Sequence, residues 1–107
     1  MTLKTEEADK TLTAFLSGEI DHHTAKPARE QIDYAIERGT AQILRLDFSD
    51  VSFMDSSGVG LVMGRYRLMQ SRGGQTWICN ATPPVMRMLK LAGLDRLPIW
   101  EKEEKKK

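Results

Sequence analysis

Two adjacent serines, Ser56 and Ser57, follow Asp55 and precede Gly58 where an apolar stretch begins. A serine in such a position has four chemical uses. It can be a nucleophile, part of a phosphate-binding loop, a helix cap, or the acceptor of a group that another enzyme transfers. The residues around the pair discriminate among these uses.

Catalysis by either serine lacks the companion residues that it needs. The nucleophile elbow requires a glycine two residues before the serine, and neither Ser56 nor Ser57 has one. A catalytic triad would need His22 or His23 as its base, and both lie upstream in a segment that we interpret as a loop. We therefore expect no enzymatic activity. A small hydrolase that uses Ser57 with a histidine is the rival interpretation.

The glycines after the serines do not form a nucleotide-binding loop. Gly58, Gly60 and Gly64 miss the dinucleotide fingerprint by one residue, and no Gly-Lys-Ser/Thr sequence follows. Gly60 and Gly64 are one helical turn apart, so they could let a helix approach another backbone closely. That backbone could belong to the same chain or to a partner.

Metal binding is not indicated by the spacing of possible ligands. Asp21, His22, His23 and Asp55 are suitable residue types, but no helical pair or comparable spacing fixes a coordination geometry. Weak magnesium association through the two aspartates stays open. We predict no metal site and no cofactor.

Phosphorylation fits the position of the serines at the start of a helix. Such a residue faces unpaired backbone N–H groups and the positive end of the helix dipole. A phosphate there would carry roughly −1.5 to −2 charges, and those groups could hold it. We expect Ser56 to be the N-cap and Ser57 to keep its hydroxyl available to a kinase. From the residues alone, capping by both serines explains the pattern equally well.

Strand and helix patterns alternate along the chain and predict the elements that position this motif. Leu12, Ala14 and Leu16 alternate with Thr11, Thr13 and Phe15 as in a strand, and Thr24 and Thr82 are expected to cap helices. The order predicts an α/β domain with a mixed, largely parallel sheet of four to five strands flanked by helices. The expected strands cover 3–8, 11–20, 42–48, 75–80 and 97–100, and the first two are expected to pair as a hairpin across the polar Asp9-Lys10 turn. The expected helices cover 25–38, 56–72 and 83–92, with Gly39 and Gly93 ending the first and the third. The first helix has an apolar face made up of Ala28, Ile32, Ala35 and Ile36.

One face of the second expected helix carries an apolar stripe typical of packing on a sheet. Val59, Val62, Met63, Tyr66 and Met69 make up this stripe. The residues Leu61, Arg65 and Leu68 lie off it. We expect these three to border a surface for a partner, and chance exposure explains them equally well.

Length, composition and cysteine content narrow the class of protein. The chain has 107 residues, 40% apolar residues and a net charge of +1, as expected for one globular domain without a bias towards nucleic acid or membranes. Cys79 is the only cysteine and is expected in the core, so no internal disulfide can form. No secretory signal or membrane-spanning run appears, so we expect a cytoplasmic protein. We expect a domain over 1–100 and a solvated charged tail over 101–107.

Three segments resemble one family of bacterial regulators, the anti-sigma factor antagonists, whose domain type is called STAS. These segments are EIDHHTA (19–25), LDFSDVSFMDSSGVGLVMGRY (46–66) and PPVMRMLKLAGL (83–94). The likeness is strongest to the sporulation members that act on the anti-sigma F factor. It extends over about residues 3 to 100. Relatives continue into a C-terminal helix, which we expect to be shortened or absent here.

The resemblance implies a partner switch without enzymatic activity. In that family the unphosphorylated antagonist binds an ATP- or ADP-bound anti-sigma factor that is also a serine kinase, and the sigma factor is freed. Phosphorylation of the second serine, here Ser57, causes release, and a phosphoserine phosphatase resets the protein. The motif is completed by Asp55, Ser56 and Gly58.

The resemblance also implies a surface beside the acceptor. Asp21 matches the family's loop aspartate, and His22, His23 and Thr24 extend that surface. No nucleic acid or membrane is expected as a partner, and the free chain is expected to be a monomer. The alternative within the fold is a STAS module of a stress or secretion switch.

Overall fold

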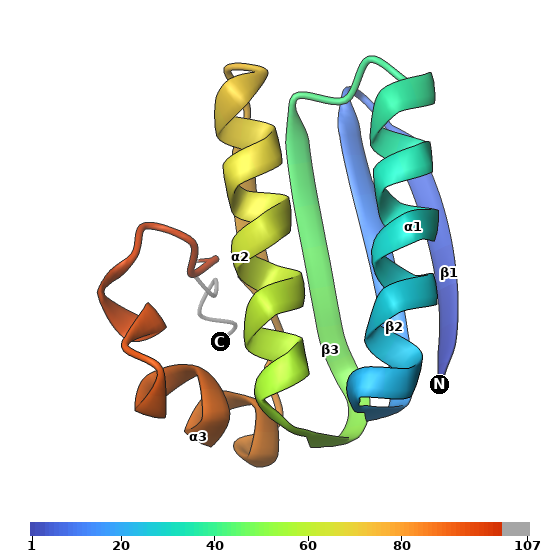
Figure 1. Cartoon of the computed structure of the whole chain (residues 1–107). Helices are drawn as coiled ribbons and strands as arrows, with labels where there is room; N and C mark the ends of the chain where they lie inside the picture. The colour runs from blue at the N-terminus through green and yellow to red at the C-terminus, as the bar shows by residue number, and fades with distance from the viewer. Residues whose placement is uncertain (102–107) are drawn as a thin grey trace, which may run out of the picture.

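The chain folds into a four-stranded sheet with helices packed against it (Figure 1). The computed structural model describes residues 1–101. The strands are hydrogen-bonded in the order β1-β2-β3-β4, with the first pair antiparallel and the other two pairs parallel. This confirms the predicted α/β class and the mixed sheet. In chain order the elements are β1 (Thr2–Ala8), β2 (Thr11–Ile20), α1 (His22–Arg38), β3 (Ile43–Met54), α2 (Ser56–Ser71), β4 (Gln75–Cys79), α3 (Pro83–Leu91) and the short 3-10 helix η1 (Leu94–Arg96).

The first two strands form the predicted hairpin, which turns at Asp9 and Lys10. Both turn residues have positive φ, 54° and 63°, as two-residue hairpin turns of the favoured twist require. The hairpin places β1 at an edge of the sheet. Its charged residues suit an edge, because charges discourage pairing with another chain.

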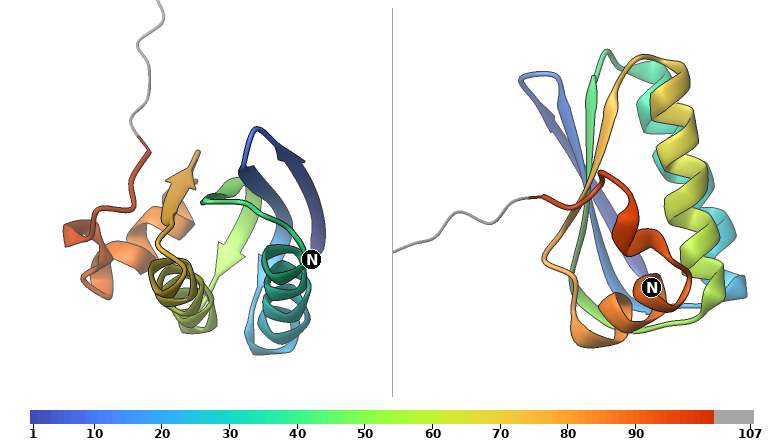
Figure 2. Two further views of the ribbon diagram at one scale, coloured as in Figure 1. Left: turned by 90° about the horizontal axis from the view of Figure 1, so that it is seen from above. Right: turned by 90° about the vertical axis from the view of Figure 1, so that its left-hand side faces the viewer.

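Helices α1 and α2 lie side by side on one face of the sheet, and α3 lies beside the β4 edge (Figure 2). Each of the first two helices connects neighbouring parallel strands, and the chain steps across the sheet in the same direction both times. Crossovers of equal hand then place both helices on the same face. This arrangement brings the two helices into contact with each other as well as with the sheet.

The core lies between the sheet and the pair of helices. Leu12, Ala14 and Leu16 of β2 are buried on the helix-covered face, and Ile32 and Ile36 of α1 pack over them. The predicted strand alternation and the apolar face of the first helix are therefore confirmed. Other buried core members are Leu44, Leu46, Phe48, Val51, Val62, Met69, Ile78, Val85, Leu89 and Ile99.

Cys79 is buried at the end of β4, as predicted for a small core residue. Burial raises the pKa of its thiol to about 12. The thiol is therefore protonated at neutral pH. A buried protonated thiol packs as a small apolar group, because only the thiolate is strongly nucleophilic.

The predicted fifth strand over 97–100 is wrong. Trp100 forms only an isolated bridge to Ile78 beside β4. The physical reason is Pro98, which has no N–H to donate to a ladder and so interrupts pairing in a segment that is already short.

Glu101, expected to begin the tail, lies against the sheet. Its carboxylate accepts two hydrogen bonds from Arg45 of β3, at 2.8 Å from Nε and 2.9 Å from Nη2. The rest of the expected tail, residues 102–107, and the question of a final helix lie outside the described residues.

Helix ends follow the predictions in part. Gly93 has a left-handed φ of 84° after α3, whereas Gly39 after α1 is extended at −106°. Thr82 precedes α3 with Pro83 as the first helical residue, as predicted. Its hydroxyl, however, donates to the carbonyl oxygen of Val51 at 2.9 Å instead of capping the helix.

Two glycines of α2, Gly60 and Gly64, do not pack closely against any other part of residues 1–101. A Cβ atom built at Gly60 or Gly64 would meet nothing within 4 Å. The expectation that they bring the helix near the protein's own sheet is therefore wrong.

Candidate functional site

The first turns of α1 and α2 meet at one edge of the sheet. β2 and β3 are parallel, and their last residues, Ile20 and Met54, are paired. Each strand is followed by one linking residue, Asp21 or Asp55, and then by its helix. The N–H of Asp55 donates to the carbonyl oxygen of Ile20 at 3.1 Å. This contact ties the start of α2 to the start of α1.

Asp21 caps α1 through a reciprocal set of hydrogen bonds. Its Oδ1 accepts from the backbone N–H groups of His23 at 2.9 Å and Thr24 at 3.1 Å, and the Thr24 hydroxyl accepts from the Asp21 N–H at 2.9 Å. The bond from the Thr24 N–H chiefly holds the pKa of Asp21 below its usual value.

The prediction that Thr24 is the N-cap is wrong, because it occupies the third helical position. Its hydroxyl completes the capping box that Asp21 begins. The predicted loop at His22 and His23 is also wrong, since both are in the first turn of α1. An aspartate accepts helix N–H groups as well as a threonine does, so the helix begins earlier than expected.

Asp55, not Ser56, caps α2. The Asp55 carboxylate accepts from the backbone N–H of Ser57 at 2.8 Å, and Ser56 is the first helical residue, with an exposed side chain. A carboxylate at this end also interacts favourably with the positive end of the helix dipole. The prediction for Ser56 is therefore corrected, and the cap leaves both serine hydroxyls free of that role.

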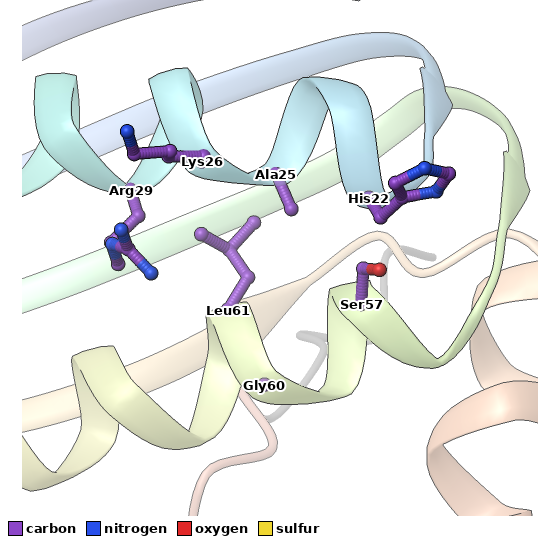
Figure 3. Close-up of a pocket in the computed structure, with 7 residues that line it drawn as sticks. All are labelled: His22, Ala25, Lys26, Arg29, Ser57, Gly60 and Leu61. Atoms are coloured by element: carbon purple, nitrogen blue, oxygen red, sulfur yellow. The ribbon is translucent and has the colours of Figure 1, made fainter.

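The Ser57 hydroxyl lies at the mouth of a groove between the two helices (Figure 3). Its side chain is partly exposed. Within residues 1–101, its Oγ has no hydrogen-bond partner, and no hydrogen bond joins it to His22 or His23. The hydrolase interpretation thus has no support from a serine–histidine contact.

Gly58, the residue after the acceptor candidate, is buried against the end of β3. A Cβ atom there would clash with the side chain of Met54. A larger residue at this position would therefore require the Met54 side chain to move.

The space between the helices has a volume of about 290 Å³, and we call it the α1–α2 groove. Its charged and titratable lining is entirely on the α1 side and contains no carboxylate. His22, Lys26 and Arg29 follow one another at intervals of four and three residues, and this spacing could have indicated a common helix face in the sequence. His23 is not among the lining residues. The groove is lined by His22, Ala25, Lys26, Arg29, Ser57, Gly60 and Leu61.

Leu61 and Arg65 are buried, with 3% and 6% of their surfaces exposed. The prediction that they lie off the core stripe is wrong, because α2 is covered by α1 as well as by the sheet. Leu61 still reaches the floor of the α1–α2 groove. Leu68 is partly buried against the core.

Arg65 pairs with Asp33 of α1, which the sequence analysis did not single out. Its Nε lies 2.8 Å from Asp33 Oδ1, without the alignment of a hydrogen bond, and Nη1 donates to the carbonyl oxygen of Leu61 at 3.4 Å. Burial raises the pKa of Asp33 and lowers that of Arg65, in each case against the attraction of the partner. The pair joins the two helices about one turn beyond Arg29 and Leu61, the last groove-lining residues of each helix.

Metal-ligand residues do not gather in the described part of the chain. No three histidine, cysteine, aspartate or glutamate side chains of residues 1–101 form a group that could hold an ion. Asp21 and Asp55, considered above as magnesium ligands, each accept backbone N–H groups instead. Over the same residues, no helix has both the length and the apolar character that a membrane span requires.

Known proteins resemble this chain in sequence and in fold. The STAS domain model matches residues 2–106. The anti-sigma F factor antagonist of Paenibacillus polymyxa is 39% identical over 104 residues, covering 96% of this chain and 89% of the relative. The anti-sigma-B factor antagonist of Bacillus subtilis is 33% identical over 90 residues, covering 83% and 81%.

Among solved structures, the anti-sigma factor antagonist SpoIIAA in its unphosphorylated form superimposes with a TM-score of 0.82 and 35% identity, over 95% of this chain and 90% of that one. The phosphorylated form of the Bacillus cell fate determinant SpoIIAA gives a TM-score of 0.74 and 34% identity, over 95% and 93%. The fold, the motif and these likenesses together show that the chain belongs to the STAS-domain family and, within it, to the anti-sigma factor antagonists.

Proposed function

We propose that this chain is the antagonist in a phosphorylation-controlled partner switch. The unphosphorylated form binds an anti-sigma factor with serine kinase activity in the cytoplasm and frees the sigma factor. Phosphorylation of Ser57 then causes release. The observation that carries the proposal is the Ser57 hydroxyl, which lies partly exposed at the start of α2 while Asp55 supplies the cap.

The chain contributes the acceptor, and the kinase contributes the catalysis. The Ser57 oxygen attacks the γ-phosphorus of ATP, the bond from that phosphorus to the ADP oxygen breaks, and the hydroxyl proton passes to a base on the kinase. A phosphatase later hydrolyses the phosphoserine with water. The relatives are antagonists of anti-sigma factors, which supports the role of Ser57 as an acceptor.

Charge explains why the modified protein lets go. A phosphate adds roughly −1.5 to −2 charges beside Asp21 and Asp55 and needs extensive hydration, which a packed interface denies it. In the free chain, the N–H groups at the start of α2 favour the same charge. Both effects shift the equilibrium towards release. About 3 to 4 kcal/mol would weaken binding several-hundredfold, since about 1.4 kcal/mol is tenfold in affinity.

A stress-response switch is the second candidate. Its support is the identity of 33% to an anti-sigma-B factor antagonist, against 39% to an anti-sigma F factor antagonist. Binding of the purified chain to both kinds of anti-sigma factor from its host distinguishes the two.

The direct test is phosphorylation by the anti-sigma factor with ATP, followed by mapping of the phosphate by mass spectrometry. We expect modification at Ser57 in the wild type and in Ser56→Ala, and none in Ser57→Ala. Phosphate on Ser56 alone, or no phosphate with either kind of anti-sigma factor, contradicts the proposal.

A further inference from the structure

The α1–α2 groove has the charge and the opening of a docking site for a polypeptide segment. It begins at Ser57 and extends along α1 past Lys26 and Arg29 (Figure 3). Arg29 belongs to no salt bridge formed within residues 1–101, and Lys26 has only an exposed contact of 3.7 Å with Glu30. The carboxylates of Asp21, Asp55 and Asp33 lie outside the lining, where they cap the helices or pair with Arg65. The lining of the groove itself therefore carries positive charge and no carboxylate.

The α2 side of the groove is open at Gly60. This glycine is three residues after Ser57, so it lies on the same side of the helix one turn further on. A glycine inside a helix is destabilising relative to alanine. No atom within 4 Å explains its presence, because a Cβ atom there would stand in open space. The missing side chain lets another backbone lie against α2 at this point.

We propose that the groove receives an acidic segment of the kinase that phosphorylates Ser57. Carboxylates of that segment pair with Lys26 and Arg29 while its backbone contacts Gly60. The apolar side chain of Leu61 forms the floor beneath it. This inference rests on the proposed function and adds the chemistry of the partner's contact surface.

The same arrangement links docking to release. A phosphate on Ser57 stands at the mouth of the groove and repels the carboxylates of the docked segment. It also competes with them for the basic side chains of α1. Complementary charge at an interface mainly determines association rate and specificity. Adding a negative phosphate to a surface that binds carboxylates is therefore an effective way to reject the partner.

The test uses the host anti-sigma factor that phosphorylates the wild-type chain, in its ADP-bound form, as the binding probe. Calorimetry at low and moderate salt compares the wild type with the double variant Lys26→Gln/Arg29→Gln and with Gly60→Ala. We expect each to bind about tenfold more weakly than the wild type. The double variant should also show a smaller loss of affinity on adding salt, because two ionic contacts are gone.

Matched controls separate the groove from general effects of charge and helix propensity. Arg67→Gln removes an exposed charge further along α2, and Gly64→Ala adds a methyl group in open space one turn beyond Gly60. Neither residue lines the groove, so both variants should bind as the wild type does. Gly60→Ala should fold normally for the same reason that Gly64→Ala does, which keeps the test valid even if the double variant is unstable.

The outcomes distinguish the two proposals. If no host anti-sigma factor binds or phosphorylates the wild type, the proposed function fails. If Ser57 is phosphorylated but the groove variants bind like the wild type, the groove inference is overturned while the proposed function stands. If Gly60→Ala binds more weakly but Lys26→Gln/Arg29→Gln binds like the wild type, the proposal that the docked segment is acidic is overturned.

Discussion

At the scale of single residues, capping of α2 and presentation of the acceptor hydroxyl belong to different residues, Asp55 and Ser57. Asp55 supplies the carboxylate that caps α2, so the Ser57 hydroxyl is not needed for helix stability. The sequence motif led to the correct helix start but to the wrong cap, because aspartate and serine are nearly equal as caps and stand side by side. Propensity alone does not choose between neighbours. The choice depends on where β3 ends, and the pairing with β2 determines that.

The separation of tasks predicts distinct effects at Ser57. Ser57→Ala should bind the anti-sigma factor with the affinity of the wild type and should stay bound in the presence of ATP. Ser57→Asp should bind at least tenfold more weakly, since it introduces a negative charge at the acceptor position. Binding measured with and without ATP tests both variants. Equal affinity of Ser57→Asp and wild type would show that charge does not cause release.

Asp21 gives a prediction for pH. Its pKa in the folded chain is below the unfolded value of about 3.9. Its ionised form therefore stabilises the fold above that value, and the contribution is lost as the pH falls through the folded pKa. Asp21→Asn keeps a capping oxygen but cannot titrate there. Urea unfolding at pH 5 and pH 3 should show a smaller loss of stability in Asp21→Asn than in the wild type, and parallel losses would contradict the assignment.

At the scale of elements, α2 makes contacts on two sides. The stripe predicted from the sequence described only the side that faces the sheet, and Val62 and Met69 of that stripe are buried. The contact with α1 buries Leu61 and Arg65 as well. An arginine does not look like a core residue in a sequence, and only the topology reveals that Asp33 lies opposite it.

The Arg65–Asp33 pair predicts unequal effects of removing its two members. Arg65 has 7% of its side-chain surface exposed and Asp33 has 29%. Asp33→Ala leaves a buried guanidinium without a partner and should destabilise the fold by about 2 to 3 kcal/mol. Arg65→Met keeps the packing and leaves a carboxyl group that water can reach or a proton can neutralise, so it should cost about 1 kcal/mol or less.

A double-variant cycle by urea denaturation checks this asymmetry. The double variant Asp33→Ala/Arg65→Met should be more stable than Asp33→Ala alone, because no unpaired charge remains. Additive losses would show that the two side chains do not interact energetically.

At the scale of the whole molecule, most of the fold followed from periodicity. Alternation in β2 and the apolar faces of the helices were sufficient to predict the layers, and the polar Asp9-Lys10 turn to predict the hairpin. The end of the chain was less predictable, because 97–100 is short and its pairing depends on a distant strand. The α1–α2 groove depends on two helices that are remote in sequence, and the periodicity of one helix does not show which residues of the other lie opposite it.

A consequence of this architecture is that phosphorylation should not change the fold. The acceptor hydroxyl has no hydrogen bond to lose within residues 1–101, and the core contains no part of it. Amide chemical shifts of the phosphorylated and unphosphorylated chains should differ near the first turns of α1 and α2 and along the groove. Shifts throughout β1 and α3 would instead indicate a global conformational change.

The burial of Cys79 protects its thiol from oxidation. With a thiol pKa raised to about 12 by burial, Cys79 is almost entirely protonated at neutral pH. Peroxides and disulfides react with the thiolate, and the sulfur is also shielded by the core. Cys79 therefore gives oxidants no accessible thiolate to attack.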